Sequence, residues 1–387
     1  MMRLLYISNF FNHHQKPLAD ELYEILGVDY TFVETWDGIP SEQLTLGYHP
    51  YNVPYVKRYS EEKERIDQMI LDADVVIYGE APLSLIKKRI LSGKLTIRDD
   101  ESRYKNPNRF LKWPLYTYNS LYLNKGYLLC ASAYAPIDYM LSGMNPKKCF
   151  KWGYFTEVKR YSDIDSLMQN KSLRKYQKVN ILWVGRLIAL KHPEYIISVA
   201  KSLKNDGCNF SINVIGTGKF GNKLKSIISK ENLEEYVSLL GPMPPENVRT
   251  YMEEADIFLF TSDRREGWGA VLNESMGSAC AVVADGNIGS VPYLINHGVN
   301  GLIYNSKDVD DLVVKVKSLI SNPSMIEEIG RRAYATMSET WNGEVAARNL
   351  IKLCSALLKG ESSPISDGPC SPAPLIMRTF KGKFKTL

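Results

Sequence analysis

Residues 255–284 read ADIFLFTSDRREGWGAVLNESMGSACAVVA, and their pattern indicates the fold class. Two apolar runs, at 257–260 and 280–284, enclose a polar loop and a helix-like segment that starts near Gly269. Short apolar runs rich in aromatic and β-branched residues are typical of strands buried on both faces. The order of strand, loop, helix and strand predicts one unit of a parallel α/β sheet.

The same alternation extends in both directions along the chain. Later strands are expected at 179–185, 210–216, 237–241 and 301–304, and helices at 193–203, 221–233, 247–255, 309–320 and 344–358. Earlier strands are expected at 3–8, 30–34, 73–79, 95–101 and 126–132, and a helix at 17–26 places Leu18, Leu22, Ile25 and Leu26 on one face. A polar stretch at 156–178 lacks clean periodicity and indicates a linker between two doubly wound units.

The bulk composition restricts the class of protein. A chain of 387 residues favours two domains over one. The net charge of +5 is compatible with an anionic substrate and argues against a nucleic-acid partner. Six cysteines without a CxxC pair favour reduced core thiols over a disulfide framework or a zinc site. No signal-peptide pattern is present and no apolar run reaches the roughly 18 residues of a spanning helix, so we expect a cytoplasmic protein, with the inner membrane face as a variant.

The chain changes character after Gly360. Residues 361–374 are rich in Ser, Pro and Gly and cannot build a core. Residues 375–387 carry a set of cations interleaved with aromatic residues: Arg378, Lys381, Lys383 and Lys385 with Phe380 and Phe384. A segment of this kind suits an anionic lipid surface, with a disordered tail as the alternative. We therefore expect 361–387 to be a flexible basic tail.

Two carboxylates stand at the ends of the segment between the central strands. Glu266 follows the strand at 257–260, and Glu274 lies one to two turns into the next helix. Gly267 and Gly269 allow close approach of a ligand to the backbone, at the strand ends where open α/β sheets bind ligands. A vicinal diol such as ribose would be held by a carboxylate. The structural alternative makes Glu266 a loop acid and Glu274 a helix N-terminal acid.

Two cations follow the strand at 179–185. Arg186 comes directly after it and Lys191 precedes Pro193, so both should lie at the same sheet edge. Arginine offers a planar fork for a diphosphate, and lysine offers a mobile point charge. Gly216 and Gly218 lie at the end of the strand at 210–216, but a lone GxG is more often a structural tight turn than a ligand-binding loop.

Taken together, these segments resemble the retaining glycosyltransferases of family 4. The resemblance rests on VGRLIALK, VIGTG, LLGPMP, the segment 255–284 and HGVNGLIY, and it covers about residues 180–345. It implies an α/β fold of the GT-B type, with two Rossmann-like domains facing across a cleft. The expected domains are an acceptor-side unit at 1–165, a donor unit at 166–345, a helix at 346–360 packing towards the first domain, and the tail at 361–387.

The resemblance also implies roles for individual residues. Arg186 and Lys191 would hold the donor diphosphate, Glu266 would contact the transferred sugar, and Glu274 would bind the ribose. The backbone at Gly267, Trp268 and Gly269, and the turn at Gly216 and Gly218, would face the donor. The implied substrates are a nucleotide sugar and a glycan or lipid-linked acceptor. Because two cations neutralise the diphosphate, no metal or other cofactor is expected.

The N-terminal half departs from the family pattern. Its first loop, SNFFNHHQKP, has His13 and His14 in place of a glycine-rich turn. These two histidines are acceptor-side candidates that could contact the acceptor or the donor phosphate, with solvated loop histidines as the alternative. A histidine that many members carry after a later strand is absent, so Arg98 and Glu101 become candidates for acceptor contacts. Asp163 and Asp165 form a DxD, but their position in the expected linker indicates surface charge.

Two other classes of function stay open at this point. One is an enzyme on the same fold, either a non-hydrolysing nucleotide-sugar epimerase or a glycan phosphorylase. The other is a sugar-binding scaffold without catalysis, which the presence of both cations and both carboxylates disfavours.

Overall fold

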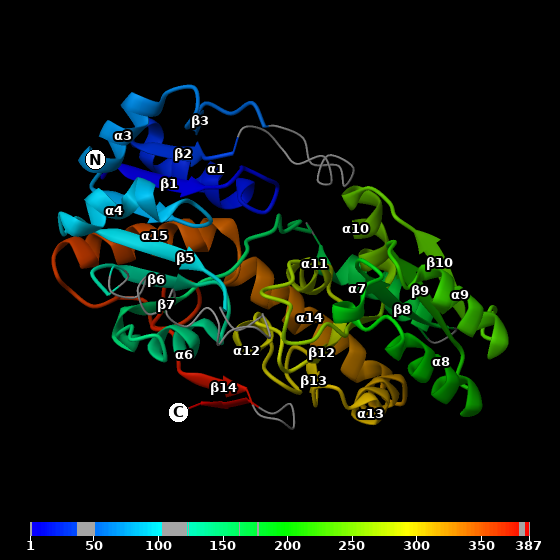
Figure 1. Ribbon diagram of the computed structural model, residues 1–387. Helices are drawn as coiled ribbons and strands as arrows, with labels where there is room; N and C mark the ends of the chain where they lie inside the picture. The colour runs from blue at the N-terminus through cyan, green and yellow to red at the C-terminus, as the bar shows by residue number, and fades with distance from the viewer. Residues whose placement is uncertain are drawn as a thin grey trace. The chain divides into compact units, whose positions relative to one another are not determined.

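The computed structural model describes residues 2–36, 51–102, 122, 124–161, 163–175, 178–378 and 384–386. The chain folds into two compact units. Unit 1 consists mainly of Met1–Glu157 and Thr340–Met377, and unit 2 mainly of Val158–Glu339. Each unit holds a parallel β-sheet covered by helices (Figure 1), which confirms the predicted pair of doubly wound α/β domains.

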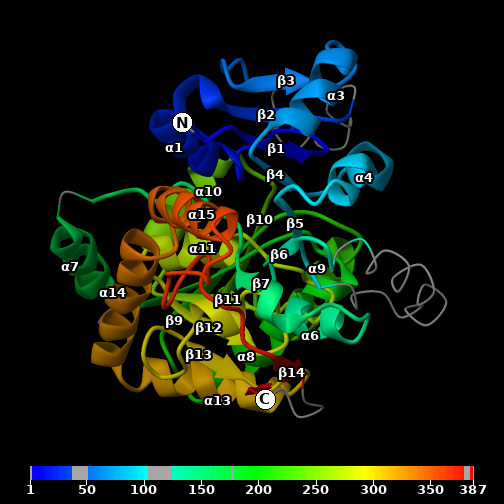
Figure 2. The same ribbon diagram turned by 90° about the vertical axis from the view of Figure 1, so that its left-hand side faces the viewer.

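The sheet of unit 1 has the strand order β3-β2-β1-β4-β5-β6-β7. Its elements are β1 (Leu4–Ser8), α1 (Lys16–Leu26), β2 (Tyr30–Glu34), β3 (Val56–Arg58), α3 (Lys63–Asp72), β4 (Val75–Tyr78), α4 (Leu83–Leu91), β5 (Thr96–Asp100), β6 (Tyr127–Cys130), α6 (Ala135–Met140), β7 (Cys149–Lys151) and α15 (Gly343–Leu358). Figure 2 shows α1 and α15 on one side of this sheet and α3 and α4 on the other. Because both faces are covered, β1 and β4 are buried at every position.

The sheet of unit 2 has the strand order β10-β9-β8-β11-β12-β13. Its elements are α7 (Ile164–Lys175), β8 (Val179–Val184), the short 3₁₀ turn η5 (Ala189–Lys191), α8 (Tyr195–Asn205), β9 (Phe210–Ile215), α9 (Gly221–Lys230), β10 (Val237–Gly241), α10 (Pro245–Glu254), β11 (Ile257–Phe260), α11 (Val271–Gly277), β12 (Ala281–Asp285), α12 (Val291–Leu294), β13 (Leu302–Tyr304), α13 (Val309–Ile320) and α14 (Pro323–Glu339). The order reverses between β8 and β11, so the loops after these two strands are neighbours.

The expected linker at 156–178 contains the helix α7, which corrects the sequence-based assignment. Among the side chains of α7 that the structure describes, Met168 and Lys171 are buried, at 2% and 3% exposed. The Lys171 ammonium donates to the carbonyls of Ala255 and Ser278 at 2.7 and 2.8 Å, which anchors α7 to unit 2. Asp163 and Asp165, at the start of this helix, are exposed, as expected for surface charge.

Residues 361–378 also differ from the expected flexible tail. Cys370 is fully buried and Ile376 is 4% exposed. The Cys370 amide donates to the Lys151 carbonyl at 2.8 Å, and the Ala373 amide donates to the Cys149 carbonyl at 2.9 Å. This segment therefore packs along β7 in unit 1. The lipid-facing prediction was made for 375–387, and three of its residues, Phe380, Lys381 and Lys383, lie outside the described residues.

Three further findings bear on the sequence-based expectations. Ile25, expected on the buried face of α1, is 40% exposed, and Ala19 is buried on this helix instead.

All six cysteines lie in described segments and are free thiols. Within the part of the chain that the structure describes, no helix combines the length and the apolar character needed to cross a bilayer.

Candidate active site

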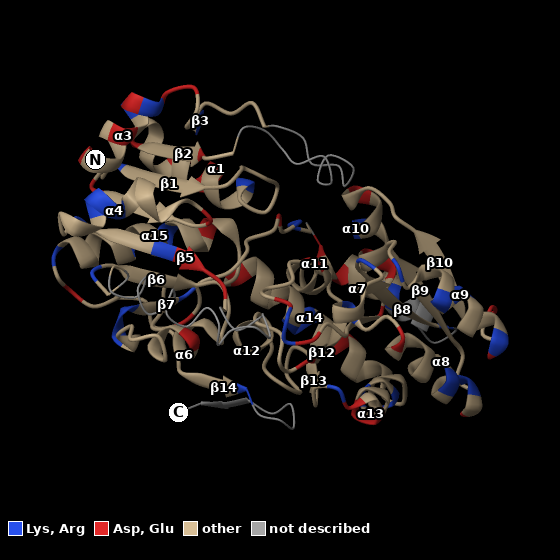
Figure 3. Ribbon diagram, in the orientation of Figure 1, with Lys and Arg blue, Asp and Glu red and all other residues tan. Residues whose placement is uncertain are grey.

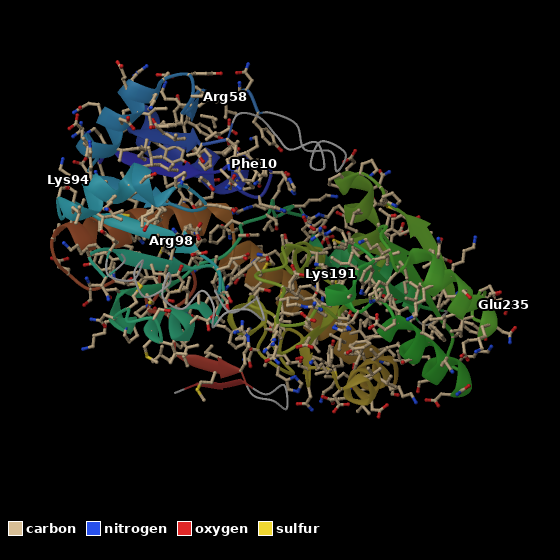
Figure 4. All side chains as sticks on the ribbon, viewed as in Figure 1. Phe10, Arg58, Lys94, Arg98, Lys191 and Glu235 are labelled. Carbon is tan, nitrogen blue, oxygen red and sulfur yellow. The ribbon has the colours of Figure 1, made fainter. Side chains whose placement is uncertain are left out.

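Lys191 and Glu266 form an ion pair at the carboxyl edge of the unit 2 sheet. The Lys191 ammonium contacts Glu266 Oε2, and the two side chains are only 13% and 16% exposed. Lys191 ends the turn η5 after β8, and Glu266 lies in the loop after β11. These strands are adjacent, with Ile257 opposite Ile181, so their carboxyl-terminal loops meet. Lys191 is labelled in Figure 4.

The turn that carries Lys191 is tied to the end of β11 by a chain of hydrogen bonds. The buried indole of Trp183 donates to Thr261 Oγ1 at 2.9 Å. The Thr261 hydroxyl in turn donates to the Lys191 carbonyl at 2.6 Å. The Trp183 and Thr261 side chains are almost fully buried, so water cannot reach their polar atoms. These two hydrogen bonds satisfy the polar atoms instead. The backbone of the lysine turn is therefore held in a fixed place.

A carboxylate and a histidine that the sequence-based analysis did not select lie beside this turn. His192 Nε2 lies 3.2 Å from Asp263 Oδ2, and His192 Nδ1 lies 2.9 Å from Glu194 Oε1. The bonds to Asp263 and then Glu194 outweigh burial and raise the pKa of His192 to about 9. Burial opposes ionisation of Asp263, but bonds from His192 and Arg265 outweigh it and lower the pKa of this carboxyl. The only signal in the sequence was their proximity to Lys191 and Glu266.

Arg186, the second predicted cation, lies just beyond β8 and is exposed. The turn at Gly216 and Gly218 packs against the same loop. A Cβ at Gly216 would lie 1.9 Å from the Gly185 carbonyl oxygen, and one at Gly218 would lie 2.4 Å from that of Leu187. Close backbone packing therefore accounts for both glycines without a ligand.

The loop 267–269 is shaped by internal contacts. Trp268 is buried, and its indole donates to Asn273 Oδ1 at 2.8 Å. Ser290 Oγ donates to the Trp268 carbonyl at 2.6 Å. Gly269 has a φ of 81°, and a Cβ there would lie 2.4 Å from Phe260 Cζ. The indole thus belongs to the core of unit 2, and the loop conformation requires glycine at 269.

Glu274 lies on α11, as expected, and is half-buried. Its helix is held by Arg249 from α10. Arg249 Nη1 donates to the Glu274 carbonyl at 3.1 Å and to Ser278 Oγ at 3.1 Å. Glu274 and Glu266 thus lie at the two ends of one loop-helix segment, as the sequence predicted.

The four acceptor-side candidates lie in unit 1. His13 and His14 follow β1, and their ring centroids lie 3.8 Å apart. The His14 ring stacks on that of Tyr154, with centroids 5.8 Å apart, and the Tyr154 hydroxyl donates to Glu101 Oε1 at 2.8 Å. Tyr154, which the sequence analysis did not select, therefore joins two of the candidates.

Arg98 is occupied within unit 1. Its Nε donates to Asp100 Oδ2 at 3.0 Å, and its guanidinium lies 5.2 Å from the ring centroid of Tyr78. Asp99, beside it, accepts a hydrogen bond from Tyr6, and burial raises the pKa of Asp99 to about 7. Figure 3 shows this run of charge along the end of β5. The edge thus offers carboxylates and aromatic rings, which suit sugar hydroxyls and sugar faces.

The comparisons with known proteins differ in how much of the chain they cover. Residues 165–336, which lie within unit 2, match the family model of glycosyl transferases group 1. The amylovoran biosynthesis glycosyltransferase AmsK of Erwinia amylovora is 30% identical over 187 residues, which cover 47% of this chain and 46% of that protein. A Campylobacter jejuni N-acetylgalactosaminyltransferase, named for a diphospho-undecaprenol-linked substrate, is 29% identical over 41% of each chain. The chain thus spans about half the length of the curated relatives it matches.

Solved structures extend the similarity of fold to both units. The crystal structure of Anabaena HepE in complex with UDP aligns with a TM-score of 0.69 at 16% identity, covering 92% of this chain and all of HepE. Sucrose-phosphate synthase of Thermosynechococcus elongatus aligns with a TM-score of 0.66 at 12% identity, covering 93% of this chain and all of that chain. At such identities the alignments support the fold alone, and they confirm the expected GT-B class of two Rossmann-like domains.

Proposed function

We propose that this protein is a glycosyltransferase that moves a sugar from a nucleotide-diphosphate sugar to a glycan or lipid-linked acceptor in the synthesis of a cell-surface polysaccharide. The observation that carries the proposal is the Lys191–Glu266 pair at the carboxyl edge of the unit 2 sheet, inside the segment that matches the family model. The names of AmsK and of the Campylobacter transferase support the polysaccharide or lipid-linked acceptor.

The donor would bind to unit 2. The exposed Arg186 guanidinium and the Lys191 ammonium would take the diphosphate, and Glu274 would accept hydrogen bonds from the ribose hydroxyls. The Lys191 ammonium has three N–H donors and can contact a phosphate while still bound to Glu266. Glu266 would accept hydrogen bonds from hydroxyls of the transferred sugar.

Transfer breaks the bond between the anomeric carbon and the diphosphate oxygen, and the electron pair leaves with the diphosphate. Positive charge builds on the sugar and negative charge on the leaving group. The partly buried Lys191 ammonium and the exposed Arg186 guanidinium would together stabilise that charge by several kcal/mol, without a metal ion. The acceptor hydroxyl forms the new bond on the face that the leaving group vacates and gives its proton to the departing phosphate. This course retains the anomeric configuration.

The experiment is a donor screen followed by a transfer assay. UDP- and GDP-sugars are added to the full chain with and without EDTA, and the melting temperature is measured. One donor should raise it, with no effect of EDTA. The stabilising donor is then incubated with undecaprenyl-diphosphate sugars and oligosaccharides, and the anomeric configuration of the product is read by NMR. If no nucleotide sugar stabilises the protein and none is turned over, the proposal fails.

The two alternatives give different products. An epimerase converts the sugar of the donor, or releases free nucleotide, when no acceptor is present. A binding scaffold shows donor stabilisation without turnover. A transferase forms a new glycosidic product only when the acceptor is present, and this is the outcome we expect.

A further inference from the structure

Asp263 links the two halves of the Lys191–Glu266 pair through its backbone. Its amide donates to the Leu190 carbonyl at 2.9 Å, within the turn that carries Lys191. Its carbonyl accepts from the Glu266 amide, also at 2.9 Å. One residue therefore sets the separation between the lysine turn and the glutamate loop.

The Asp263 side chain is fixed from two directions. Arg265 holds it as a fork, with Nε 3.0 Å from Oδ1 and Nη2 2.6 Å from Oδ2. His192 holds it from the side of the lysine turn, at 3.2 Å. Side chains that are locked by partners in this way hold neighbouring functional groups in place.

His192 has an unfavourable backbone conformation, with φ 48° and ψ 53°. Left-handed backbone is uncommon for residues other than glycine, although Asn, Asp and His adopt it more often than the rest, and it persists where surrounding contacts hold it. Here both ring nitrogens are engaged, and the ring stacks on that of Tyr195 with centroids 4.8 Å apart. Since His192 directly follows Lys191 as the C-cap of its turn, these side-chain contacts anchor the end of the turn that carries the lysine.

From these contacts we propose that Asp263 and His192 are a positioning pair that holds the Lys191 ammonium against Glu266. The pair touches no reacting atom and acts through Lys191. Its effect on turnover rests on the proposed function, whereas its effect on the placement of Lys191 does not.

Charged and titratable groups from several elements face His192. Glu194 and Tyr195 come from the start of α8, Asp263 from the loop after β11, and Asp285 from the end of β12. The positive charge of Lys223, on α9, also favours the ionised form of Glu194. The carboxylates outweigh burial and raise the pKa of His192, so the ring is a cation at neutral pH and loses its charge near pH 9. The pair should therefore loosen in alkaline solution.

The first test measures how accessible Lys191 is. Lysines of the full chain are reductively methylated in limiting reagent, and mass spectrometry gives the rate at Lys191 relative to exposed Lys225. Asp263→Asn removes the charge, and His192→Gly removes the ring while tolerating the left-handed backbone. Each variant should raise the methylation rate of Lys191 relative to Lys225 on the order of tenfold. The reason is that the turn that carries Lys191 would open more often and expose the ammonium. Asp206→Asn, which breaks the exposed ion pair with Lys317, is the matched control and should leave the ratio unchanged.

The second test needs no variant for its main measurement. In the wild-type chain the methylation rate of Lys191 relative to Lys225 should be constant from pH 7 to 8.5 and rise above pH 9. In His192→Gly this alkaline rise should be absent. An unchanged ratio in either folded variant, or no alkaline rise in the wild type, overturns the proposal.

The third test uses turnover. In Asp263→Asn, kcat should fall by about 10²-fold, as expected for a misplaced catalytic group, with a smaller change in donor KM. If the wild type transfers no sugar, the proposed function fails while the methylation result still decides the positioning pair. If transfer occurs and Asp263→Asn keeps wild-type kcat, the positioning pair has no role in catalysis and this proposal fails alone.

Discussion

The Lys191 ammonium touches the Glu266 carboxylate inside unit 2, and water reaches only a small fraction of either side chain. Breaking such a pair leaves one buried charge without its partner, which costs more than the pair itself contributes. Substitution of either residue alone should therefore disturb both charge and position at the proposed donor site.

Lys191→Met keeps much of the apolar stem and removes the charge. We expect kcat for sugar transfer to fall by about 10²- to 10³-fold, the usual effect of losing one group that stabilises developing negative charge. Initial rates at saturating donor measure this. Lys225→Met is the control, because Lys225 is exposed on α9, and it should keep wild-type kcat. Wild-type kcat in Lys191→Met would contradict the assignment of the donor site.

Gly269→Ala should destabilise unit 2 by about 2–3 kcal/mol, because a strained backbone and an overpacked contact add up. The new Cβ would lie 2.4 Å from Phe260 Cζ at a φ of 81°. Urea denaturation gives the free energy of unfolding. Gly298→Ala is a matched control with a φ of 80° and no atom within 4 Å of the new Cβ. The Gly298→Ala variant therefore carries the backbone strain without a steric clash, and its free energy of unfolding should fall by about 1 kcal/mol. Equal losses in the two variants would refute the steric part of the prediction.

Lys171→Met should lower the free energy of unfolding by about 2–4 kcal/mol, because buried carbonyls lose their donor. The Lys171 ammonium donates to the carbonyls of Ala255 and Ser278 in the wild type. Thermal and urea melts check this against Lys230→Met, an exposed change at the end of α9 that should be nearly neutral. A neutral Lys171→Met would mean that α7 contributes little to unit 2.

The charge on His192 should make stability depend on pH. Its pKa in the folded protein, about 9, lies above its ordinary value near 6.5. The charged form is therefore stabilised by folding, fully so below pH 6.5, and that contribution is lost as the pH rises through 9. The melting temperature should fall as the pH rises from about 6.5 to just above 9, and it should fall less in His192→Gly. Parallel pH curves for the two proteins would contradict the prediction.

Much of the fold was predictable from single segments. Strands buried on both faces are nearly continuous apolar runs, so β1, β4, β11 and β12 stand out from the polar loops around them. Arg186, Lys191 and Glu266 follow such strands, which predicted their location at one sheet edge. This reasoning needs only local pattern and the geometry of parallel sheets.

Local pattern failed where packing overrides it. Helix α7 has no clear apolar face, because one of its buried residues is Lys171, whose charge is compensated by distant carbonyls. The segment 361–378 has the composition of a disordered tail, yet Cys370 is buried because its backbone pairs with β7, the last strand of the unit 1 sheet. Neither compensation is visible in the segment itself.

By itself the sequence determined the alternation of buried strands and helices, and the chemical groups that follow each strand, because burial and backbone geometry act over a few residues. Only the tertiary structure decided which loops meet. The order of the strands places β8 beside β11. That order brings His192 to Asp263 and Lys191 to Glu266, since contacts between distant segments depend on how whole elements pack rather than on the period of any one of them.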